Sequence, residues 1–216
     1  ENSLLVGTIV ATDVDTDAEL LRFDLEGGDS SNFSIDVVTG VLSFNIAPDY
    51  EEKASYSVTV AVSDGENSTS QEVTVLITNE NDTKPEITST DTYTVVENAI
   101  QIGVVAATDG DGDALTYSLS GTDSNDINLD TTSGVLSFKI APDYEEITSY
   151  SVTVAVSDGE NSTSQEVTVL ITNENDTKPE FTSTDTYTVV ENTIQIGVIA
   201  ATDGDGDALT YSLSGT

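Results

Sequence analysis

The residues with the clearest chemical potential are acidic, and they lie in short clusters directly after apolar stretches. Asp109-Gly-Asp-Gly-Asp113 is one such cluster, and Asn173-Glu-Asn-Asp176 is another. Carboxylate, amide and backbone carbonyl oxygens are the ligands that Ca²⁺ prefers. The chain has no histidine and no cysteine, which disfavours Zn²⁺ and Cu²⁺. The clusters therefore predict sites for a hard divalent cation.

The charge composition of the chain also indicates a divalent cation as its binding partner. Among 216 residues, 40 are Asp or Glu and only 5 are Lys or Arg, which gives a formal net charge of −35. Nucleic acids and anionic membrane surfaces repel such a chain, because binding them needs clustered Lys and Arg. Divalent cations are the natural counter-charge. The absence of cysteine also excludes a disulfide framework.

Other interpretations of the acidic clusters fit less well. A solvated acidic surface accounts for a single Asp or Glu, but less readily for several clusters that recur along the chain. An EF-hand loop needs Gly at its sixth position and Glu at its twelfth, and counting from Asp109 these are Ala114 and Ser120. A calcium-binding β-roll needs tandem nine-residue copies, which the chain does not have.

The elements that must position these clusters are repeated along the chain with an offset of 94 residues. The repeated stretches are Asn79–Glu86 with Asn173–Glu180, Ala47–Glu52 with Ala141–Glu146, Ser63–Val73 with Ser157–Val167, and Ala106–Thr122 with Ala200–Thr216. Such a period suits an independent small domain rather than a solenoid coil.

Three domains are predicted from this period. Residues 1–82 form a repeat that lacks its first strand, residues 83–176 a complete repeat, and residues 177–216 the N-terminal fragment of a third repeat. The chain starts without Met and ends inside an unfinished pattern, so we expect it to be a piece of a longer protein. No apolar run approaches the roughly 20 residues that span a bilayer.

Within one repeat the pattern predicts an all-β fold. Tyr150–Ser157 alternates strictly between apolar and polar residues, and Val167, Val169 and Ile171 alternate in the next run. Asp130–Val135 is typical of a hairpin connection in which Gly134 adopts a positive φ. About seven short antiparallel strands in under a hundred residues favour a Greek-key β-sandwich, immunoglobulin-like in architecture.

The last piece carries the same strand pattern in shortened form. We predict strands at Tyr187–Val190, Ile196–Thr202 and Leu209–Leu213. Too few strands are present there to bury a two-sheet core. The terminal pieces are therefore expected to be weaker than the middle repeat.

The acidic residues end strands, so in a sandwich they gather at its two poles. In the middle repeat Asp109, Asp111 and Asp158 end strands that run the same way and should share one pole. Glu97 and the turn that contains Asp143 and Glu145 should lie near Asn173–Asp176 at the opposite pole. We expect the poles of successive repeats to meet at the linker.

The ordered motifs resemble the extracellular cadherin repeat, in the form found in large bacterial surface proteins. The motifs are Glu97-Asn98, Ala107-Thr-Asp-Gly-Asp111, Leu115-Thr-Tyr-Ser-Leu119, Asp143-Tyr-Glu145, Ala155-Val-Ser-Asp-Gly159 and Asn173-Glu-Asn-Asp176, the last followed by Pro179 and Phe181. The resemblance covers nearly all of the chain. It implies tandem seven-stranded Greek-key sandwiches with Ca²⁺ bound between successive repeats.

The resemblance also implies which residues bind calcium. At the first junction they are Glu1, Asp49, Glu51, Asn79, the backbone carbonyls of Glu80 and Asn81, Asp82, Asp109, Asp111 and Asp158. At the second junction they are Glu97, Asp143, Glu145, Asn173, Glu174, Asn175, Asp176, Asp203 and Asp205. Asp13, Asp15 and Asp64 would face a preceding repeat.

Two departures from the family's linker pattern concern the outermost ion site. Asn79 and Asn173 replace an Asp, which removes one negative charge, and Thr83 and Thr177 replace an Asn, which is a better ligand. An amide oxygen can still coordinate an ion, but the resemblance implies that both changes weaken the ion site nearest the following repeat.

The leading hypothesis for function is a calcium-rigidified segment of an extracellular or cell-surface adhesion protein, anchored by other parts of its parent. Its partners would be calcium ions and homophilic repeats, other surface proteins or polysaccharide. The alternatives are a carbohydrate-binding module of a secreted polysaccharide-acting enzyme and a passive spacer. An enzyme is not expected, because the carboxylates are better explained as ligands.

Overall fold

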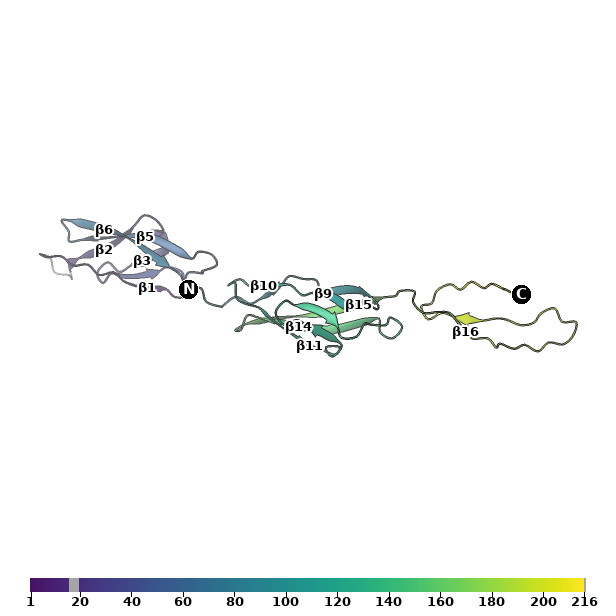
Figure 1. The fold of residues 1–216 in the computed structure, drawn as a ribbon. Helices are drawn as coiled ribbons and strands as arrows, with labels where there is room; N and C mark the ends of the chain where they lie inside the picture. Colours follow the sequence, from purple (N-terminus) through teal and green to yellow (C-terminus); the bar gives the residue numbers. More distant parts are fainter. Residues whose placement is uncertain (16–19, 216) are drawn as a thin grey trace. The chain divides into compact units, whose positions relative to one another are not determined.

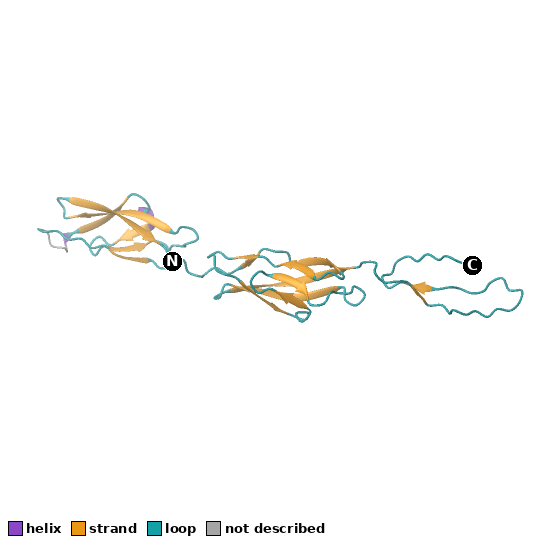
Figure 2. Cartoon of the chain, viewed as in Figure 1, coloured by secondary structure: helices purple, strands orange, loops and turns teal. Residues whose placement is uncertain are grey.

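The computed structural model describes residues 1–15 and 20–215, and these form two compact units. Unit 1 consists of Glu1–Thr83 together with Gly110–Asp113, and unit 2 of Lys84–Asp109 together with Ala114–Thr216. The regular secondary structure of the described residues is β-strand, apart from short turns such as the 3-10 turn η2 (Ser30–Asn32). Figure 2 shows the strands in orange, connected by loops. The predicted repeat boundaries at residues 82 and 176 stay predictions.

Unit 1 is built from two small antiparallel sheets. One has the order β1-β4-β3 and the other the order β2-β5-β6. Their bounds are β1 (Leu5–Thr8), β2 (Arg22–Glu26), β3 (Phe33–Ile35), β4 (Val41–Phe44), β5 (Ser55–Ser63) and β6 (Ser68–Leu76). Leu42 and Phe44 from the first sheet pack with Val58 from the second, so the core of the unit lies between the sheets.

Unit 2 contains the larger sandwich (Figure 1). Its sheets have the orders β11-β14-β15-β8 and β12-β13-β9, with the pairs β10-β7 and β16-β17 beside them. The bounds are β7 (Glu86–Ile87), β8 (Thr92–Val96), β9 (Gln101–Val104), β10 (Ala107–Thr108), β11 (Thr116–Ser120), β12 (Ile127–Leu129), β13 (Val135–Phe138), β14 (Ser149–Ser157), β15 (Ser162–Thr172), β16 (Glu180–Phe181) and β17 (Ala201–Thr202).

Seven strands of unit 2 make the sandwich if β7 with β8, and β9 with β10, are each counted as one interrupted strand. The pairing is antiparallel except between β15 and β8, which run parallel from Thr168↔Thr92 to Thr172↔Val96. The predicted all-β sandwich class is confirmed.

Strict alternation identified the inward faces of the two long strands. Along β14 the buried residues are Tyr150, Val152, Val154 and Val156, the last two with no exposed surface. In β15 the buried residues are Val167, Val169 and Ile171. This follows from the geometry of a strand, in which successive side chains point to opposite faces.

Alternation did not identify Val105, which is fully buried although it follows the end of β9. The register between β13 and β9 shifts after Leu136, which pairs with Gly103, so that Ser137 pairs with Gln101. Such an irregularity changes which residues face inward. As a result Val104 is 45% exposed and its neighbour Val105 enters the core.

The strands predicted for the last piece are mostly wrong. Only β16 and the short β17 occur between residues 177 and 215, and Tyr187–Val190 and Leu209–Leu213 are not in strands. A strand needs a partner that takes up its backbone hydrogen bonds. In the middle repeat β15 and β14 supply those partners, whereas in the described part of the last piece no corresponding strands are present. No helix among the described residues is long and apolar enough to cross a bilayer.

The turn between β12 and β13 requires a glycine. Gly134 has a φ of +69°, and a Cβ atom there would lie 2.3 Å from the backbone oxygen of Val105. Gly159 also has a positive φ, +106°, but an added Cβ would meet no atom within 4 Å. Substituting Gly159 would therefore cause backbone strain alone, whereas substituting Gly134 would cause the same strain and also a clash with the backbone of Val105.

We predict that Gly134→Ala destabilises the chain more than Gly159→Ala does. Both variants place alanine in the left-handed region, which costs about 1–2 kcal/mol. Gly134→Ala also forces overpacking, which typically costs a further ~1–3 kcal/mol. Urea unfolding of the two variants measures the difference, and equal losses of unfolding free energy would contradict the proposed clash.

Candidate metal centre

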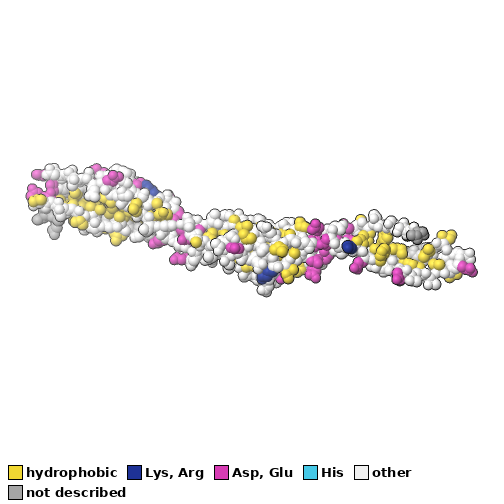
Figure 3. Space-filling view, viewed as in Figure 1, with side chains coloured by type: hydrophobic (Ala, Val, Ile, Leu, Met, Phe, Trp, Pro, Cys, Tyr) yellow, Lys and Arg dark blue, Asp and Glu magenta, His cyan; other side chains and the backbone are white. Residues whose placement is uncertain are grey.

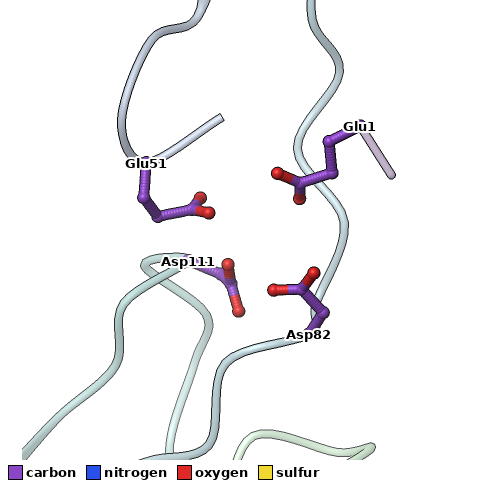
Figure 4. A group of neighbouring side chains, drawn as sticks. All are labelled: Glu1, Glu51, Asp82 and Asp111. Carbon is purple, nitrogen blue, oxygen red and sulfur yellow. The ribbon is translucent and has the colours of Figure 1, made fainter. Parts of the chain in front are cut away.

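Four carboxylates of unit 1 converge on one point. Glu1, Glu51, Asp82 and Asp111 each offer a carboxylate oxygen, and these oxygens all lie within 4.8 Å of one another. Figure 4 shows the four side chains turned toward a common centre. Four negative charges at this spacing repel one another unless a cation lies among them.

Glu1 is the residue that ties this cluster to the sandwich. Its Oε2 accepts a hydrogen bond from the backbone N–H of Tyr50 at 2.6 Å, and its Oε1 accepts one from Glu80 N–H at 2.9 Å. One carboxylate thus holds the turn after β4 and the linker after β6 in place. The turn carries Glu51 and the linker carries Asp82, so both cluster members are positioned by Glu1.

The linker and the Asp111 loop are joined by direct hydrogen bonds. The Thr83 backbone N–H donates to Asp111 Oδ2 at 2.9 Å, and Asn79 Nδ2 donates to the Asp111 backbone oxygen at 2.8 Å. Asn79 stands where the resemblance expects an Asp, and its amide supplies a donor that a carboxylate lacks. The replacement therefore contributes a hydrogen bond in this position.

Unit 2 repeats three members of this cluster, 94 or 96 positions further on, whereas Asp176, the equivalent of Asp82, is not within the same distance of them. Glu97, Glu145 and Asp205 have carboxylate oxygens within 4.8 Å of one another. Glu97 is only 2% exposed; its Oε2 accepts from Tyr144 N–H at 2.8 Å and its Oε1 from Glu174 N–H at 2.7 Å. Charged hydrogen bonds to both oxygens make burial of this anion tolerable.

Asp205 supplies the clearest indication of a ligand. Its Oδ2 accepts from Thr177 N–H at 2.8 Å, and Asn173 Nδ2 donates to its backbone oxygen at 3.0 Å. Its Oδ1 is buried and has no hydrogen-bond partner among the described residues. A buried carboxylate oxygen without a donor is costly, and a bound cation removes that cost. Asp203 and Asp207 place further carboxylate oxygens within 4.8 Å of Asp205.

Two asparagines position the linker acids, and the sequence interpretation missed them. Asn2 and Asn98 have positive φ angles of 60° and 65°. Their Nδ2 groups donate to Asp82 Oδ2 at 2.8 Å and to Asp176 Oδ2 at 2.6 Å. The only indication in the sequence is that each directly follows the anchoring glutamate. Asp207 was also missed, although it continues the Asp-Gly-Asp run.

Several other predicted ligands form turns in this structure. Asp49 accepts from Glu52 N–H at 3.0 Å, and Asp143 accepts from Glu145 N–H at 2.9 Å. Asp64 and Asp158 each accept two backbone N–H groups from the residues two and three positions later. Asp15 N–H donates to Asp13 Oδ1 at 3.0 Å. These contacts neither require nor prevent metal binding by the second carboxylate oxygen.

The remaining predicted ligands lie in or beside the linkers. Asp109 is half-buried and directly follows β10. The linker after β6 contains Asn81 and Asp82, and the linker after β15 contains Glu174, Asn175 and Asp176. The proposed contribution of Glu80 and Asn81 is a backbone carbonyl. Which of these oxygens bind an ion stays a prediction.

The electrostatics of the clusters appear in two glutamate pKa values. Desolvation raises the pKa of Glu51, and the charges of Glu1, Asp111 and Asp49 raise it further. Desolvation also raises the pKa of Glu145, with added repulsion from Glu97, Asp205 and Asp143. Both side chains remain solvent-exposed, so solvent screens part of this effect. The raised pKa values indicate that, without a cation, ionising every carboxylate of a cluster at once is unfavourable.

The donor set fits a hard divalent cation. It consists of carboxylate, amide and carbonyl oxygens, and the chain has no histidine or cysteine. Ca²⁺ takes six to eight oxygen ligands in flexible geometry, whereas Mg²⁺ needs a near-ideal octahedron and keeps several waters. Several carboxylates held close together on separate loops suit the flexible geometry of Ca²⁺ better than the strict octahedron of Mg²⁺.

Comparison with known protein families gives two matches along the chain. Residues 1–78 match the model of the Cadherin domain, and residues 81–172 match that of the Bacterial Ig domain. The two matches lie on successive stretches of nearly repeated sequence. Together they cover the first sandwich and most of the second.

Curated relatives and solved structures extend the similarity. The chain is 30% identical over 222 residues to Cadherin-related family member 1 of Gallus gallus, covering 93% of this chain and 26% of the relative. It is 34% identical over 184 residues to Protocadherin-20 of Homo sapiens, covering 79% of this chain and 19% of the relative. The chain thus spans about a quarter or less of these relatives.

Among solved structures, the chain superposes on human CDH23 EC21-23 with a TM-score of 0.75 and 25% identity, covering 94% of this chain and 80% of that one. Mouse Cadherin-23 EC22-24 gives a TM-score of 0.71 and 23% identity, covering 94% and 73%. These neighbours share the tandem β-sandwich fold.

We predict that Glu145→Gln has opposite effects on stability with and without a divalent cation. Since the folded-state pKa of Glu145 is raised above the ordinary 4.5, stability is lost as pH rises through that raised value. In chelator at neutral pH the variant, which cannot ionise there, should therefore melt higher than the parent chain, and the difference should vanish below about pH 4. With a divalent cation present, loss of a ligand should make it melt lower.

The matched control is Glu160→Gln, which removes the same charge from an exposed position of unit 2 outside the cluster. Calorimetric melts at several pH values measure both variants. If Glu145→Gln and Glu160→Gln shift the melting temperature equally in chelator, repulsion within the cluster is not the cause.

Proposed function

We propose that this chain, a tandem array of cadherin-like repeats, is a calcium-binding and calcium-rigidified segment of an extracellular or cell-surface adhesion protein. The observation that carries the proposal is the recurrence of one carboxylate cluster in both units, each anchored by a glutamate that holds two backbone N–H groups. A cluster that arose only from a solvated acidic surface has no need for such anchoring.

In unit 1 the proposed ligands are Glu1, Glu51, Asp82 and Asp111, with Asp49, Asn79 and the carbonyls of Glu80 and Asn81 beside them. In unit 2 they are Glu97, Glu145 and Asp205, with Asp143, Asn173, Asn175, Asp176 and Asp203 beside them. Bound calcium would supply positive charge to oxygens that otherwise repel one another. In unit 1, hydrogen bonds from Glu1, Asn79 and Thr83 already hold the linker next to the turn after β4 and the Asp111 loop without an ion.

Rigidity is the expected consequence of that charge balance. Residues 79–83 reach the Asp111 loop through two hydrogen bonds of 2.8 and 2.9 Å. Each net hydrogen bond contributes only about 0.5–1.5 kcal/mol, so two of them resist thermal motion weakly. Shared coordination of Asp82 and Asp111 by one ion would hold the same segments far more firmly.

The adhesion part of the proposal rests on similarity. Structures with a similar fold include the extracellular domains of protocadherins. We infer an extracellular or surface location, with partners that include other cadherin-like repeats, and no catalytic role. Of the alternatives, a carbohydrate-binding module gains no support from Tyr117 and Tyr150, which are each only 8% exposed and offer no stacking platform.

We predict that calcium raises the melting temperature of the chain. A ligand that binds only the folded state stabilises it by about 2.7 kcal/mol at a hundredfold excess over Kd. Thermal melts in chelator and in several millimolar Ca²⁺ measure the shift, with Mg²⁺ at equal ionic strength as the control. A melting curve that calcium leaves unmoved would sink the proposal.

We also predict that Asp111→Asn weakens calcium binding at least tenfold, whereas Glu80→Ala leaves it within about twofold. Asp111 loses a charge at the centre of a cluster, and tenfold corresponds to about 1.4 kcal/mol. Glu80 is proposed to contribute its backbone carbonyl, which the substitution keeps. Titration calorimetry measures both variants, and the reverse order of effects would show that the ligands are assigned wrongly.

A further inference from the structure

A cavity with a tyrosine in its wall occurs at the same place in both units. Its volume is about 450 Å³ in unit 1 and about 310 Å³ in unit 2. Every residue that lines the unit 2 cavity has its counterpart, 94 positions earlier, in the wall of the unit 1 cavity. The tyrosines are Tyr56 and Tyr150, at the start of the long strands β5 and β14. The cavity is therefore a property of the repeat and not of one loop.

In unit 1 a lysine of the chain itself places its ammonium group at this cavity. Lys53 Nζ pairs with Asp29 Oδ1 at 2.5 Å and lies 4.6 Å from the centroid of the Tyr56 ring. The other oxygen, Asp29 Oδ2, accepts a hydrogen bond from Ser57 N–H at 2.9 Å. The bonds from Lys53 and Ser57 lower the pKa of Asp29. A carboxylate and an aromatic face thus hold one ammonium ion between them.

Unit 2 has the same carboxylate and the same tyrosine but not the lysine. Asp123 is the counterpart of that aspartate, and its Oδ2 accepts from Ser151 N–H at 2.7 Å. Ile147 stands at the position of Lys53, and among the described residues no lysine pairs with Asp123. Asp123 Oδ1 is therefore the oxygen whose counterpart in unit 1 binds an ammonium group.

Tyr150 provides a second acceptor in unit 2. It lines the cavity and is 8% exposed, and its hydroxyl makes no hydrogen bond within the described part of the chain. Buried tyrosine hydroxyls usually have a partner. Burial raises the pKa of Tyr150, and the charges of Asp126, Asp123 and Glu146 raise it further. The same negative surroundings favour a cation next to the ring.

The lysine that lines the unit 2 cavity has a different role. Lys139 stands at the position of Asn45, and its Nζ donates to Asn125 O at 2.6 Å. Asn45 Nδ2 donates to the equivalent oxygen of Ser31 at 3.0 Å. Lys139 is thus bound to the turn before β12. The acidic side chains in the cavity wall outnumber it, and they are Asp126, Asp143 and Glu146.

We propose that unit 2 binds a lysine side chain of a partner protein, with its ammonium group on Asp123 Oδ1 and next to Tyr150, as Lys53 lies in unit 1. The aliphatic stem of the bound lysine runs along Ile147, which is 43% exposed. Ile140, which is 84% exposed, offers an apolar wall to the neighbouring atoms of the partner. Asp123 and Tyr150 are not among the proposed calcium ligands, so this site is separate from the carboxylate clusters.

Charge favours a basic partner protein as the occupant. The net charge is −35, and Figure 3 shows acidic side chains far outnumbering Lys and Arg on the face in view. Such a field attracts positively charged partners and repels a second copy of this chain. A free amine would gain the charged contact alone, whereas a lysine within a peptide also contacts the apolar wall.

The test is an NMR titration of the full 216-residue chain, in saturating calcium, with a lysine blocked at both termini. One partly exposed ion pair binds weakly, so we expect millimolar affinity. The Ser151 N–H and Tyr150 ring signals should shift and saturate. The same compound acetylated on Nε carries no charge and should leave them unmoved. n-Butylammonium, which has the stem and the charge without the peptide groups, should bind more weakly.

Exchanging one residue between the units gives two matched variants. Ile147→Lys supplies unit 2 with the lysine of unit 1, and this should abolish the response at Ser151. Lys53→Ile removes the ammonium group that unit 1 supplies to itself, so a second saturable response should appear at Ser57 N–H.

A second pair of variants tests the carboxylate. Asp123→Asn should weaken binding by about fivefold or more, because a neutral acceptor forms the weaker hydrogen bond with an ammonium group. Glu160→Gln removes the same charge from another exposed position of unit 2 and should leave the affinity within about twofold, because solvent and salt screen it.

Four results would overturn the proposal. Equal responses to the charged and the acetylated compound would show that no ammonium group is recognised, and an unchanged response in Ile147→Lys would place the probe elsewhere. Equal affinities for n-butylammonium and blocked lysine would exclude a partner protein as the source. A response that occurs at the Glu97 cluster in chelator and disappears in calcium would show that the probe merely replaces the metal ion.

Discussion

The carboxylate of Glu97, with Glu1 as its counterpart in unit 1, is the group on which the rest of each cluster depends. Each glutamate accepts backbone hydrogen bonds from two segments that are distant along the chain, at 2.6–2.9 Å. One segment carries Glu51 or Glu145, and the other continues into Asp82 or Asp176. Glutamine, the neutral side chain of similar size, could not accept both bonds in this geometry, because its amide has one acceptor oxygen and a nitrogen that only donates.

In unit 2 the buried charge of Glu97 has hydrogen-bond donors on both oxygens, while the carboxylates beside it lie close together and repel one another. The anchoring glutamate has donors on both oxygens, whereas Asp205 Oδ1 is buried with no hydrogen-bond partner among the described residues. The raised pKa values of Glu51 and Glu145 have the same origin in crowded negative charge. The fold therefore brings the acids together at a cost, and the proposed calcium ions are what would offset it.

Near-identical stretches of this chain have different structures in different repeats. The same five-residue strand occurs paired as β8 and unpaired at Thr186–Val190, and the same acceptor edge occurs covered in β15 and open beside β6. Exposure of Leu76 and Val189 follows directly from the missing partners. A strand forms only where a partner takes up its backbone hydrogen bonds, so the local sequence alone does not decide which copy of a stretch becomes a strand.

Local pattern determined the all-β class, the inward faces of β14 and β15, and the turn at Gly134, because period-two alternation and positive φ are properties of short stretches. The sequence also placed the acids at strand ends and included Glu1, Glu51, Asp82 and Asp111 among the candidate ligands. It did not reveal the burial of Val105, the positioning by Asn2 and Asn98, or the absence of strands at Tyr187–Val190 and Leu209–Leu213. Each of these depends on a register shift or on a partner far along the chain, so only the tertiary structure decided which strands form and which oxygens come within 4.8 Å.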